Sequence, residues 1–80
     1  MTHDEIERRL KKVLWYELGA DIEKITPSSR FREDLGTDSL DDVELTLAVE
    51  EEFDLEISDI EAQRLLTFGD AVNYLTDRLQ

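Results

Sequence analysis

The chain has 80 residues and no cysteine, which excludes disulfide bonds and cysteine-based metal sites. Its 21 acidic and 9 basic residues give a formal net charge of −12, a field that repels nucleic acid and anionic membranes and attracts basic protein surfaces. A chain of this length buries only about 60–65% of the surface that its unfolded form exposes, so there is little room for a deep active-site cleft.

The first predicted helix begins at a cap on Thr2 and ends near Gly19. Thr2 and Glu5 match a capping box, in which each side chain satisfies a backbone amide of the other. Apolar residues recur at three- and four-residue spacings and predict one buried stripe: Ile6, Leu10, Val13, Leu14 and Leu18. Trp15 and Tyr16 lie off this stripe, so we expect them to be partly exposed. We expect a monomer, although self-association through these two residues is left open.

A long connection, residues 20–37, follows and contains the turn sequence Thr26-Pro27-Ser28-Ser29. We expect its regularly spaced apolar residues to anchor it to the core: Ile22, Ile25, Phe31 and Leu35. A connection of this length inside a compact domain is usually functional or disordered, and the regular anchors favour an ordered, functional one.

The second predicted helix begins near Asp38-Ser39 and runs to about Phe53. Asp and Ser both suit an N-cap, and the free amides and dipole of a helix N-terminus favour a phosphate group nearby. Ser39 is therefore either a simple cap or a site for a phosphate-containing group. Its hydroxyl has no evident activating base, because His3 is the only histidine and lies in the N-terminal cap.

Two further helices complete the predicted fold. Ser58 and Glu61 form a capping box at the start of a short third helix that leads to Leu65, and the fourth helix begins at Thr67. The fourth helix carries a set of residues inward: Phe68, Ala71, Val72, Leu75 and Leu79. The short links imply that the second, third and fourth helices are packed neighbours. We expect one domain, residues 1–80, with an all-α four-helix bundle, a long first loop and a short third helix.

An acidic block covers residues 33–62, which contain 13 acidic residues and no lysine or arginine. Scattered acids merely keep a small domain soluble, but an uncompensated block favours a surface that binds basic partners. A calcium loop that starts at Asp34 is excluded, because Gly36 and Leu45 stand at its third and twelfth positions, and no metal site is predicted. No apolar run or signal-peptide pattern predicts insertion into or transport across a membrane, so a cytoplasmic location is expected.

The stretch from Ile25 to Leu40, ITPSSRFREDLGTDSL, closely resembles the signature of the acyl carrier protein family. The resemblance extends over essentially the whole chain through further residues: Asp41, Val43-Glu44-Leu45, Glu50-Glu51-Glu52-Phe53-Asp54, Ile57 and Tyr74-Leu75. It implies that a phosphopantetheinyl transferase attaches 4′-phosphopantetheine from coenzyme A to Ser39, and that Asp38 assists recognition or metal-assisted transfer. The thiol of this arm then carries an acyl group as a thioester, and the protein itself is not an enzyme.

Helical spacing and the resemblance together predict an outward face on the second helix. We expect it to contact acyl-transferring and chain-elongating enzymes that have basic docking surfaces, through a mixed apolar and acidic set: Leu40, Asp41, Val43, Glu44, Leu47, Glu50 and Glu51. Burial of Val43 and Leu47 in the core is the alternative, because a small bundle needs its aliphatic residues.

The resemblance also implies a cavity that receives the acyl chain, lined by a second set: Phe31, Asp42, Leu45, Thr46, Val49, Ile57, Leu65, Ala71 and Tyr74. The family commonly has uncharged or apolar residues at the positions of Asp42 and Thr46. Because an unpartnered buried carboxylate is costly, we expect Asp42 at the cavity mouth. We therefore hypothesise that this protein shelters long apolar acyl chains less well than a general fatty-acid carrier does. Unusual residues on the other side could also reshape the cavity: Leu66, Phe68 and Gly69.

Fatty-acid biosynthesis is the favoured pathway, and a dedicated carrier for specialised polyketide or lipid synthesis is the alternative. Asp38 argues against a carrier of amino acids, a branch that tends to have another residue before the modified serine. An unmodified acidic helical module that only binds proteins would explain the charge, but it would leave the Ser39 pattern as a coincidence.

Overall fold

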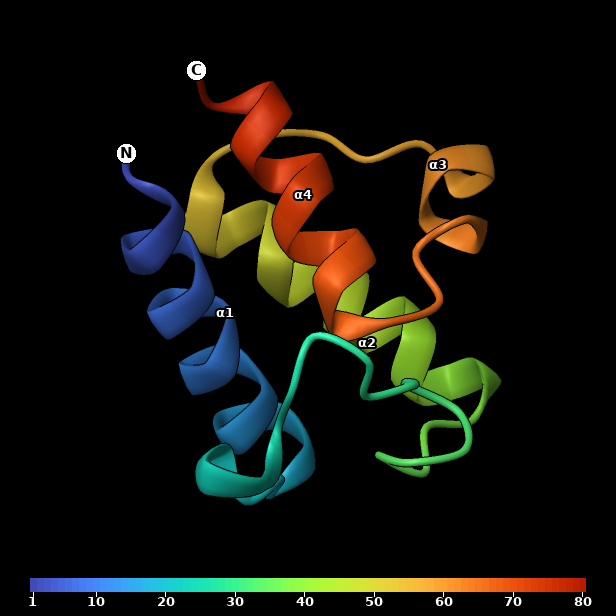
Figure 1. Ribbon diagram of the computed structural model, residues 1–80. Helices are drawn as coiled ribbons and strands as arrows, with labels where there is room; N and C mark the ends of the chain where they lie inside the picture. Colours follow the sequence, from blue (N-terminus) through green and yellow to red (C-terminus); the bar gives the residue numbers. More distant parts are fainter.

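The computed structural model describes residues 1–80, which form four α-helices and one short 3₁₀ helix (Figure 1). The elements are α1 His3–Leu18, η1 Ile22–Lys24, α2 Ser39–Phe53, α3 Asp59–Gln63 and α4 Phe68–Arg78. The predicted all-α four-helix fold, with its long first loop and short third helix, is confirmed. No helix combines the length and the apolar character that crossing a lipid bilayer requires.

Side-chain caps begin the α-helices at the predicted positions. Complete capping boxes start three of them, formed by the pairs Asp38/Asp41, Ser58/Glu61 and Thr67/Asp70. At α1, Thr2 Oγ1 accepts a hydrogen bond from the Glu5 amide at 3.1 Å, which is one of the two bonds of the predicted box. These caps use local side chains to satisfy amides that a helix N-terminus leaves unpaired.

Helix α3 is shorter than predicted. It ends at Gln63 and not at Leu65, because the Arg64 amide donates to the Glu61 carbonyl and the Leu65 amide to the Ala62 carbonyl, both at 3.1 Å. Such three-residue bonds tighten the last turn and end the helix. No residue of α3 is buried.

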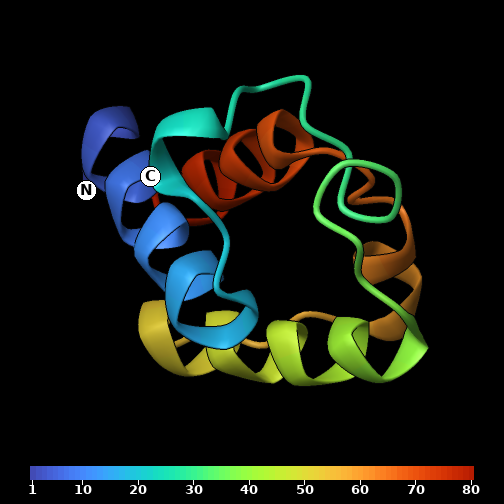
Figure 2. The ribbon, with the colours of Figure 1, turned by 90° about the horizontal axis from the view of Figure 1, so that it is seen from below.

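Helix α1 is the centre of the packing. It packs against both α2 and α4, and Figure 2 shows α1 at one end of a ring with α2 and α4 on its two sides and α3 at the far end. The short links predicted that α2, α3 and α4 pack against one another, but the helix pairs in closest contact are α1 with α2 and α1 with α4. The prediction was wrong in this respect. A helix of five residues with no buried side chain has no apolar face to pack, whereas α1 carries four buried residues: Ile6, Leu10, Val13 and Leu14.

The loop between α1 and α2 is anchored by three of its four expected residues. Ile25 is buried, and Phe31 and Leu35 are partly buried against the core. Ile22 is 38% exposed, so the prediction that it anchors the loop was wrong. It lies in η1, a turn that Asp21 caps and that buries none of its residues.

Backbone hydrogen bonds fasten this loop to the start of α4. The Phe68 amide donates to the Ser29 carbonyl and the Gly69 amide to the Pro27 carbonyl, each at 2.9 Å. The Phe31 amide donates to the Leu66 carbonyl at 3.1 Å. The loop is therefore ordered by partners that lie about 40 residues away in the sequence.

Candidate functional site at the N-terminus of α2

Ser39 is the first residue of α2 and is exposed, but it does not cap the helix. The cap is Asp38, whose Oδ1 accepts a hydrogen bond from the Asp41 amide at 2.9 Å, while Asp41 Oδ2 accepts one from the Asp38 amide at 3.1 Å. The Ser39 hydroxyl takes part in none of the side-chain hydrogen bonds that hold the fold. Its oxygen is therefore available to a molecule from solution.

The turn that leads to Ser39 is fixed by an arginine–carboxylate pair. Asp34 Oδ2 accepts hydrogen bonds from the Arg30 amide at 2.8 Å and from Arg30 Nε at 3.2 Å. The side-chain hydrogen bond from Arg30 is the main cause that lowers the pKa of Asp34, and the same bond raises the pKa of Arg30. Gly36 follows with φ 72°, a left-handed conformation that glycine adopts without steric cost.

Thr37 lies between this turn and the cap, and it is buried at 5% exposure. Its amide donates to the Phe31 carbonyl at 3.0 Å, but its Oγ1 has no hydrogen-bond partner. A buried unsatisfied hydroxyl costs about 1–3 kcal/mol. Sequence reasoning missed this residue, because nothing in the local pattern distinguishes a buried threonine from an exposed one.

Helix α2 presents the two faces that its spacing predicts. Leu45, Val49 and Phe53 are buried, whereas Leu40 is 67%, Val43 58% and Leu47 56% exposed. The alternative that Val43 and Leu47 join the core is therefore wrong. Three large aliphatic side chains are therefore exposed together on one face of this helix.

Some acids beside this apolar row are exposed, and others form hydrogen bonds within the fold. Glu44 and Glu51 are exposed, but Asp41 is engaged in the capping box. Glu50 Oε2 accepts a hydrogen bond from the Ile57 amide at 2.7 Å, which ties α2 to the segment before α3. Glu50 thus stabilises the fold at one carboxylate oxygen.

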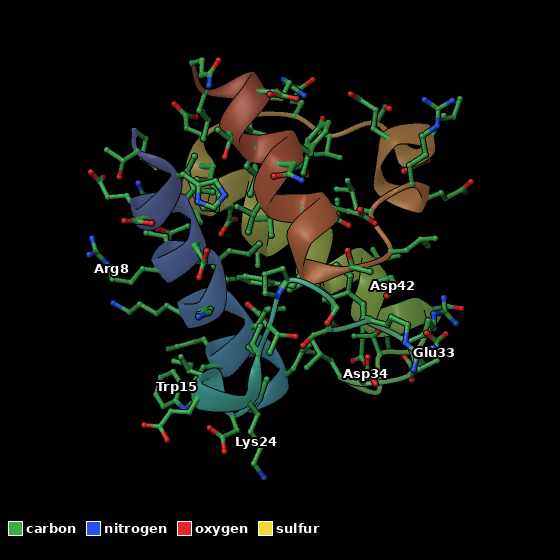
Figure 3. All side chains as sticks on the ribbon, viewed as in Figure 1. Arg8, Trp15, Lys24, Glu33, Asp34 and Asp42 are labelled. Atoms are coloured by element: carbon green, nitrogen blue, oxygen red, sulfur yellow. The ribbon has the colours of Figure 1, made fainter.

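Arg30 and Arg32 lie among the acids and pair with Asp34 and Asp42, whereas other basic residues lie on the opposite side of the molecule. Figure 3 shows Arg8, Trp15 and Lys24 on the side of α1 and η1, and Glu33 and Asp34 across the molecule from them. The acids form no group of three or more that could hold a metal ion.

Trp15 and Tyr16 are 53% and 79% exposed, which confirms the prediction that this pair is partly exposed.

The apolar and aromatic residues expected to line an acyl cavity fall into three groups. Four belong to the buried core: Leu45, Val49, Ile57 and Ala71. Phe31 and Tyr74 are partly buried and pack against that core, and Leu65 is partly buried outside it. The set therefore comes from the first loop, α2, the segments on either side of α3, and α4.

Asp42 and Thr46 reach half-buried positions with their polar groups satisfied. Arg32 Nη2 lies 2.6 Å from Asp42 Oδ2, so the first loop supplies a cation to this carboxylate. Thr46 Oγ1 donates to the Asp42 carbonyl at 2.8 Å within the same helix. Neither side chain leaves an unpartnered charge in the core, which removes the cost that such burial carries.

A polar cluster near the C-terminal end of α4 was not predicted. Arg78 donates hydrogen bonds to the Glu56 carbonyl, at 3.1 Å, and to the Tyr74 hydroxyl, and its guanidinium lies 5.5 Å from the centre of the Tyr74 ring. Hydrogen bonds from the side chains of Ser58 and Tyr74 lower the pKa of Glu61. Burial is the main cause that raises the pKa of Tyr74. The hydrogen bond from Arg78 to Glu56 joins α4 to the segment before α3, and no spacing rule points to it.

A family model described as phosphopantetheine attachment site matches residues 8–75. The matched segment contains the cap, Ser39, the exposed row of α2 and nearly all of the core.

Proposed function

Because the chain belongs to the phosphopantetheine attachment-site family, we propose that Ser39 is the residue modified and that the chain carries acyl intermediates of fatty-acid biosynthesis. The family is one of carrier domains that bear a covalent 4′-phosphopantetheine and catalyse no reaction themselves. When attached, this arm supplies a thiol that holds a carboxylic acid as a thioester. Transferases and acyl-handling enzymes act on such carriers.

The observation that carries the proposal is the uncommitted hydroxyl of Ser39 at a helix N-terminus. The Asp41 amide is taken by Asp38 Oδ1 and the Asp42 amide by the Asp38 carbonyl, which leaves the amides of Ser39 and Leu40 without partners in the fold. Free amides and the positive end of the helix dipole favour a phosphodiester at this place. The residues present therefore fit the arm at its attachment point.

Intact mass tests the attachment. Apo protein is incubated with coenzyme A and a broad-specificity phosphopantetheinyl transferase, as wild type, Ser39→Ala and Ser28→Ala. We expect one added phosphopantetheine on wild type and on Ser28→Ala, which removes an exposed hydroxyl elsewhere, and none on Ser39→Ala. Folded wild type that gains no mass, or a modified Ser39→Ala variant, would contradict the proposal.

We expect partner enzymes to bind the exposed face of α2. Its row of Leu40, Val43 and Leu47 fits an apolar pocket, and the exposed carboxylates of Glu44 and Glu51 fit lysine or arginine side chains. Surface ion pairs contribute roughly 0–1 kcal/mol each, so binding through them is fast, brief and sensitive to salt. These properties suit a carrier that must release each enzyme in turn.

Charge reversal tests this docking face. Glu44→Lys is compared with Glu17→Lys, which makes the same charge change at an exposed position of α1. We expect kcat/KM for malonyl transfer by an acyltransferase of fatty-acid synthesis to fall about two- to fivefold in Glu44→Lys. The Glu17→Lys variant should stay near wild type, and added salt should shrink the difference. Equal losses in both variants would show that only net charge matters.

A dedicated carrier for a specialised pathway is the second candidate, and Asp42 is the observation that favours it. The Arg32–Asp42 pair and the Thr46 hydroxyl place polar groups beside the buried Leu45 and Val49. A polar edge favours short or oxygenated cargo over a long apolar chain. Hydrolysis of an octanoyl thioester that is as slow as in a general fatty-acid carrier would argue for the first candidate.

A further inference from the structure

Thr37 carries the one buried side-chain polar atom of the chain that lacks a hydrogen-bond partner. The other buried polar residue, Ser29, differs, because its Oγ accepts a hydrogen bond from the Thr26 amide at 2.9 Å. Two half-buried threonines inside helices also differ. Thr46 and Thr76 donate to carbonyls four residues earlier, at 2.8 and 2.7 Å. Thr37 lies outside a helix and has no such carbonyl.

The Thr37 side chain cannot be explained by packing alone. Valine has nearly the same shape and would fill the same space without a hydroxyl to desolvate. The residue is also fixed in place, because its amide donates to the Phe31 carbonyl at 3.0 Å and Asp38 caps α2 immediately after it. A fixed, buried hydroxyl without an internal partner indicates a partner that the polypeptide does not contain.

The phosphopantetheine arm proposed on Ser39 lies within reach of Thr37, and its carbonyl groups need a hydrogen-bond donor. Two residues of chain span at most about 7 Å, so Thr37 is close to the root of any arm attached to Ser39. The arm contains amide carbonyls, and a loaded arm adds a thioester carbonyl. When such a carbonyl leaves water it must find a donor, and a threonine hydroxyl is one.

We propose that Thr37 Oγ1 donates a hydrogen bond to a carbonyl oxygen of the arm or of its thioester when the cargo lies against the core. Thr37 is then a positioning residue that favours the sheltered state of the cargo over its exposed state. The proposal rests on attachment at Ser39. It explains why a hydroxyl is kept where a valine would leave the unloaded protein at least as stable.

Two variants separate the hydroxyl from the shape of the side chain. Thr37→Val keeps the shape and removes the hydroxyl, and Thr37→Ser keeps the hydroxyl. Each variant and the wild type are prepared unmodified, with phosphopantetheine from coenzyme A, and with octanoyl-phosphopantetheine from octanoyl-coenzyme A, and intact mass confirms every form. Two quantities are measured: the melting temperature of the unmodified protein and the hydrolysis rate of the octanoyl thioester at mildly alkaline pH.

In Thr37→Val, the stability of the unmodified protein and the protection of the octanoyl thioester are expected to change in opposite directions. Unmodified Thr37→Val should melt at the wild-type temperature or higher, because an unpaired hydroxyl is lost. Its octanoyl thioester should hydrolyse roughly three- to tenfold faster than that of wild type, the effect of losing one hydrogen bond from the sheltered state. Thr37→Ser should hydrolyse within about twofold of wild type. A purely structural threonine would move both quantities toward instability.

Each remaining outcome overturns the proposal or identifies the carbonyl. A lower melting temperature of unmodified Thr37→Val would mean that the hydroxyl already has a partner, such as a buried water, and would overturn it. Unchanged octanoyl hydrolysis in Thr37→Val would also overturn it.

Amide chemical shifts of Thr37 distinguish the two possible acceptors, an amide carbonyl of the arm and the thioester carbonyl. A change on addition of the arm indicates an arm amide, a change only on octanoylation indicates the thioester, and no change at either step contradicts the bond. Wild type that accepts no phosphopantetheine would instead remove the function proposed for Ser39.

Discussion

Asp38 and Ser39 have separate roles at the start of α2. Asp38 caps the helix, and Ser39 presents an exposed hydroxyl. The Asp38 carboxylate accepts a hydrogen bond from the Asp41 amide, and the Asp38 amide donates one to the Asp41 carboxylate, so the helix begins without help from Ser39. An N-cap of this kind stabilises a helix by about 1 kcal/mol. Because the cap is supplied by its neighbour, the Ser39 hydroxyl can be modified without loss of helix stability.

Glu61 leads to a pH prediction at the residue scale. Hydrogen bonds from Ser58 and then Tyr74 lower its pKa from the ordinary value of 4.5 in the folded state. A lowered folded pKa means that the stability linked to Glu61 is complete above the unfolded pKa and is lost as the pH falls through the lower folded value. We expect carboxyl chemical shifts of Glu61 in wild type to titrate below 4.5.

Ser58→Ala is the matched variant for this measurement, because it removes the main donor and leaves the carboxyl in place. Its Glu61 should titrate closer to the ordinary value, and the acid side of its unfolding curve should shift in the same direction. A wild-type Glu61 that titrates at 4.5 or above would show that the surrounding acids outweigh the hydrogen bonds.

At the scale of elements, the first loop owes its shape to α4. Three backbone hydrogen bonds join residues 27–31 to residues 66–69, and a short bridge pairs Arg30 with Thr67. Because Thr37 is in turn bonded to Phe31, the position of the segment before Ser39 depends on the start of α4. Helix α4 therefore supports the candidate site from a distance in the sequence.

Gly69→Ala tests this support. A Cβ at Gly69 would lie 2.8 Å from the Pro27 carbonyl oxygen, so the loop or the helix must move. Alanine gains about 1 kcal/mol in helix propensity, but overpacking against backbone costs about 1–3 kcal/mol. We expect a net loss of about 1 kcal/mol, which lowers the melting temperature by roughly 4–8 °C in a domain of this size.

Asn73→Ala is the control for that comparison, because residue 73 is exposed on the same helix. It gains helix propensity without a clash and should melt at the wild-type temperature or slightly above it. A Gly69→Ala protein as stable as Asn73→Ala would mean that the loop yields without cost.

At the scale of the whole molecule, an excess of 12 negative charges opposes the compact state. Few of the acids have cationic partners, the closest being Asp42 with Arg32 at 2.6 Å and Glu52 with Arg9 at 2.7 Å. Glu44 and Glu51 on the exposed face of α2 belong to none of the ion pairs of the chain, which suits electrostatic steering of basic partners. The same charge lowers stability through self-repulsion.

Salt is therefore expected to stabilise this protein. Raising the salt concentration from 0.01 to about 0.15 M shortens the screening length from about 30 to about 8 Å, so repulsion within the acidic block weakens. We expect the melting temperature to rise with salt and with millimolar Mg²⁺. Glu51→Gln, which removes one exposed charge from the block, should melt above wild type at low salt and close to it at high salt. A melting temperature that stays constant or falls with salt would contradict this account.

The features that could be predicted from the sequence are those set by short spacings along the chain. Apolar residues three and four apart give the inward faces of α1, α2 and α4, and caps lie within three residues of the amides that they satisfy. The bounds of α2 and the position of Ser39 at its N-terminus follow from such local rules, and the family pattern around Ser39 is itself a local signature. Local rules gave no reason to separate the roles of Asp38 and Ser39.

Only the tertiary structure decided the features that depend on contacts between distant segments. The exposure of Ile22, the pairing of Arg32 with Asp42 and the bond from the Ile57 amide to Glu50 each depend on which element lies opposite. The unpaired hydroxyl of Thr37 is of the same kind, because burial is set by the surrounding elements and not by neighbours in the sequence. Helical periodicity determines which face of a helix turns inward, but packing determines which polar groups find partners there.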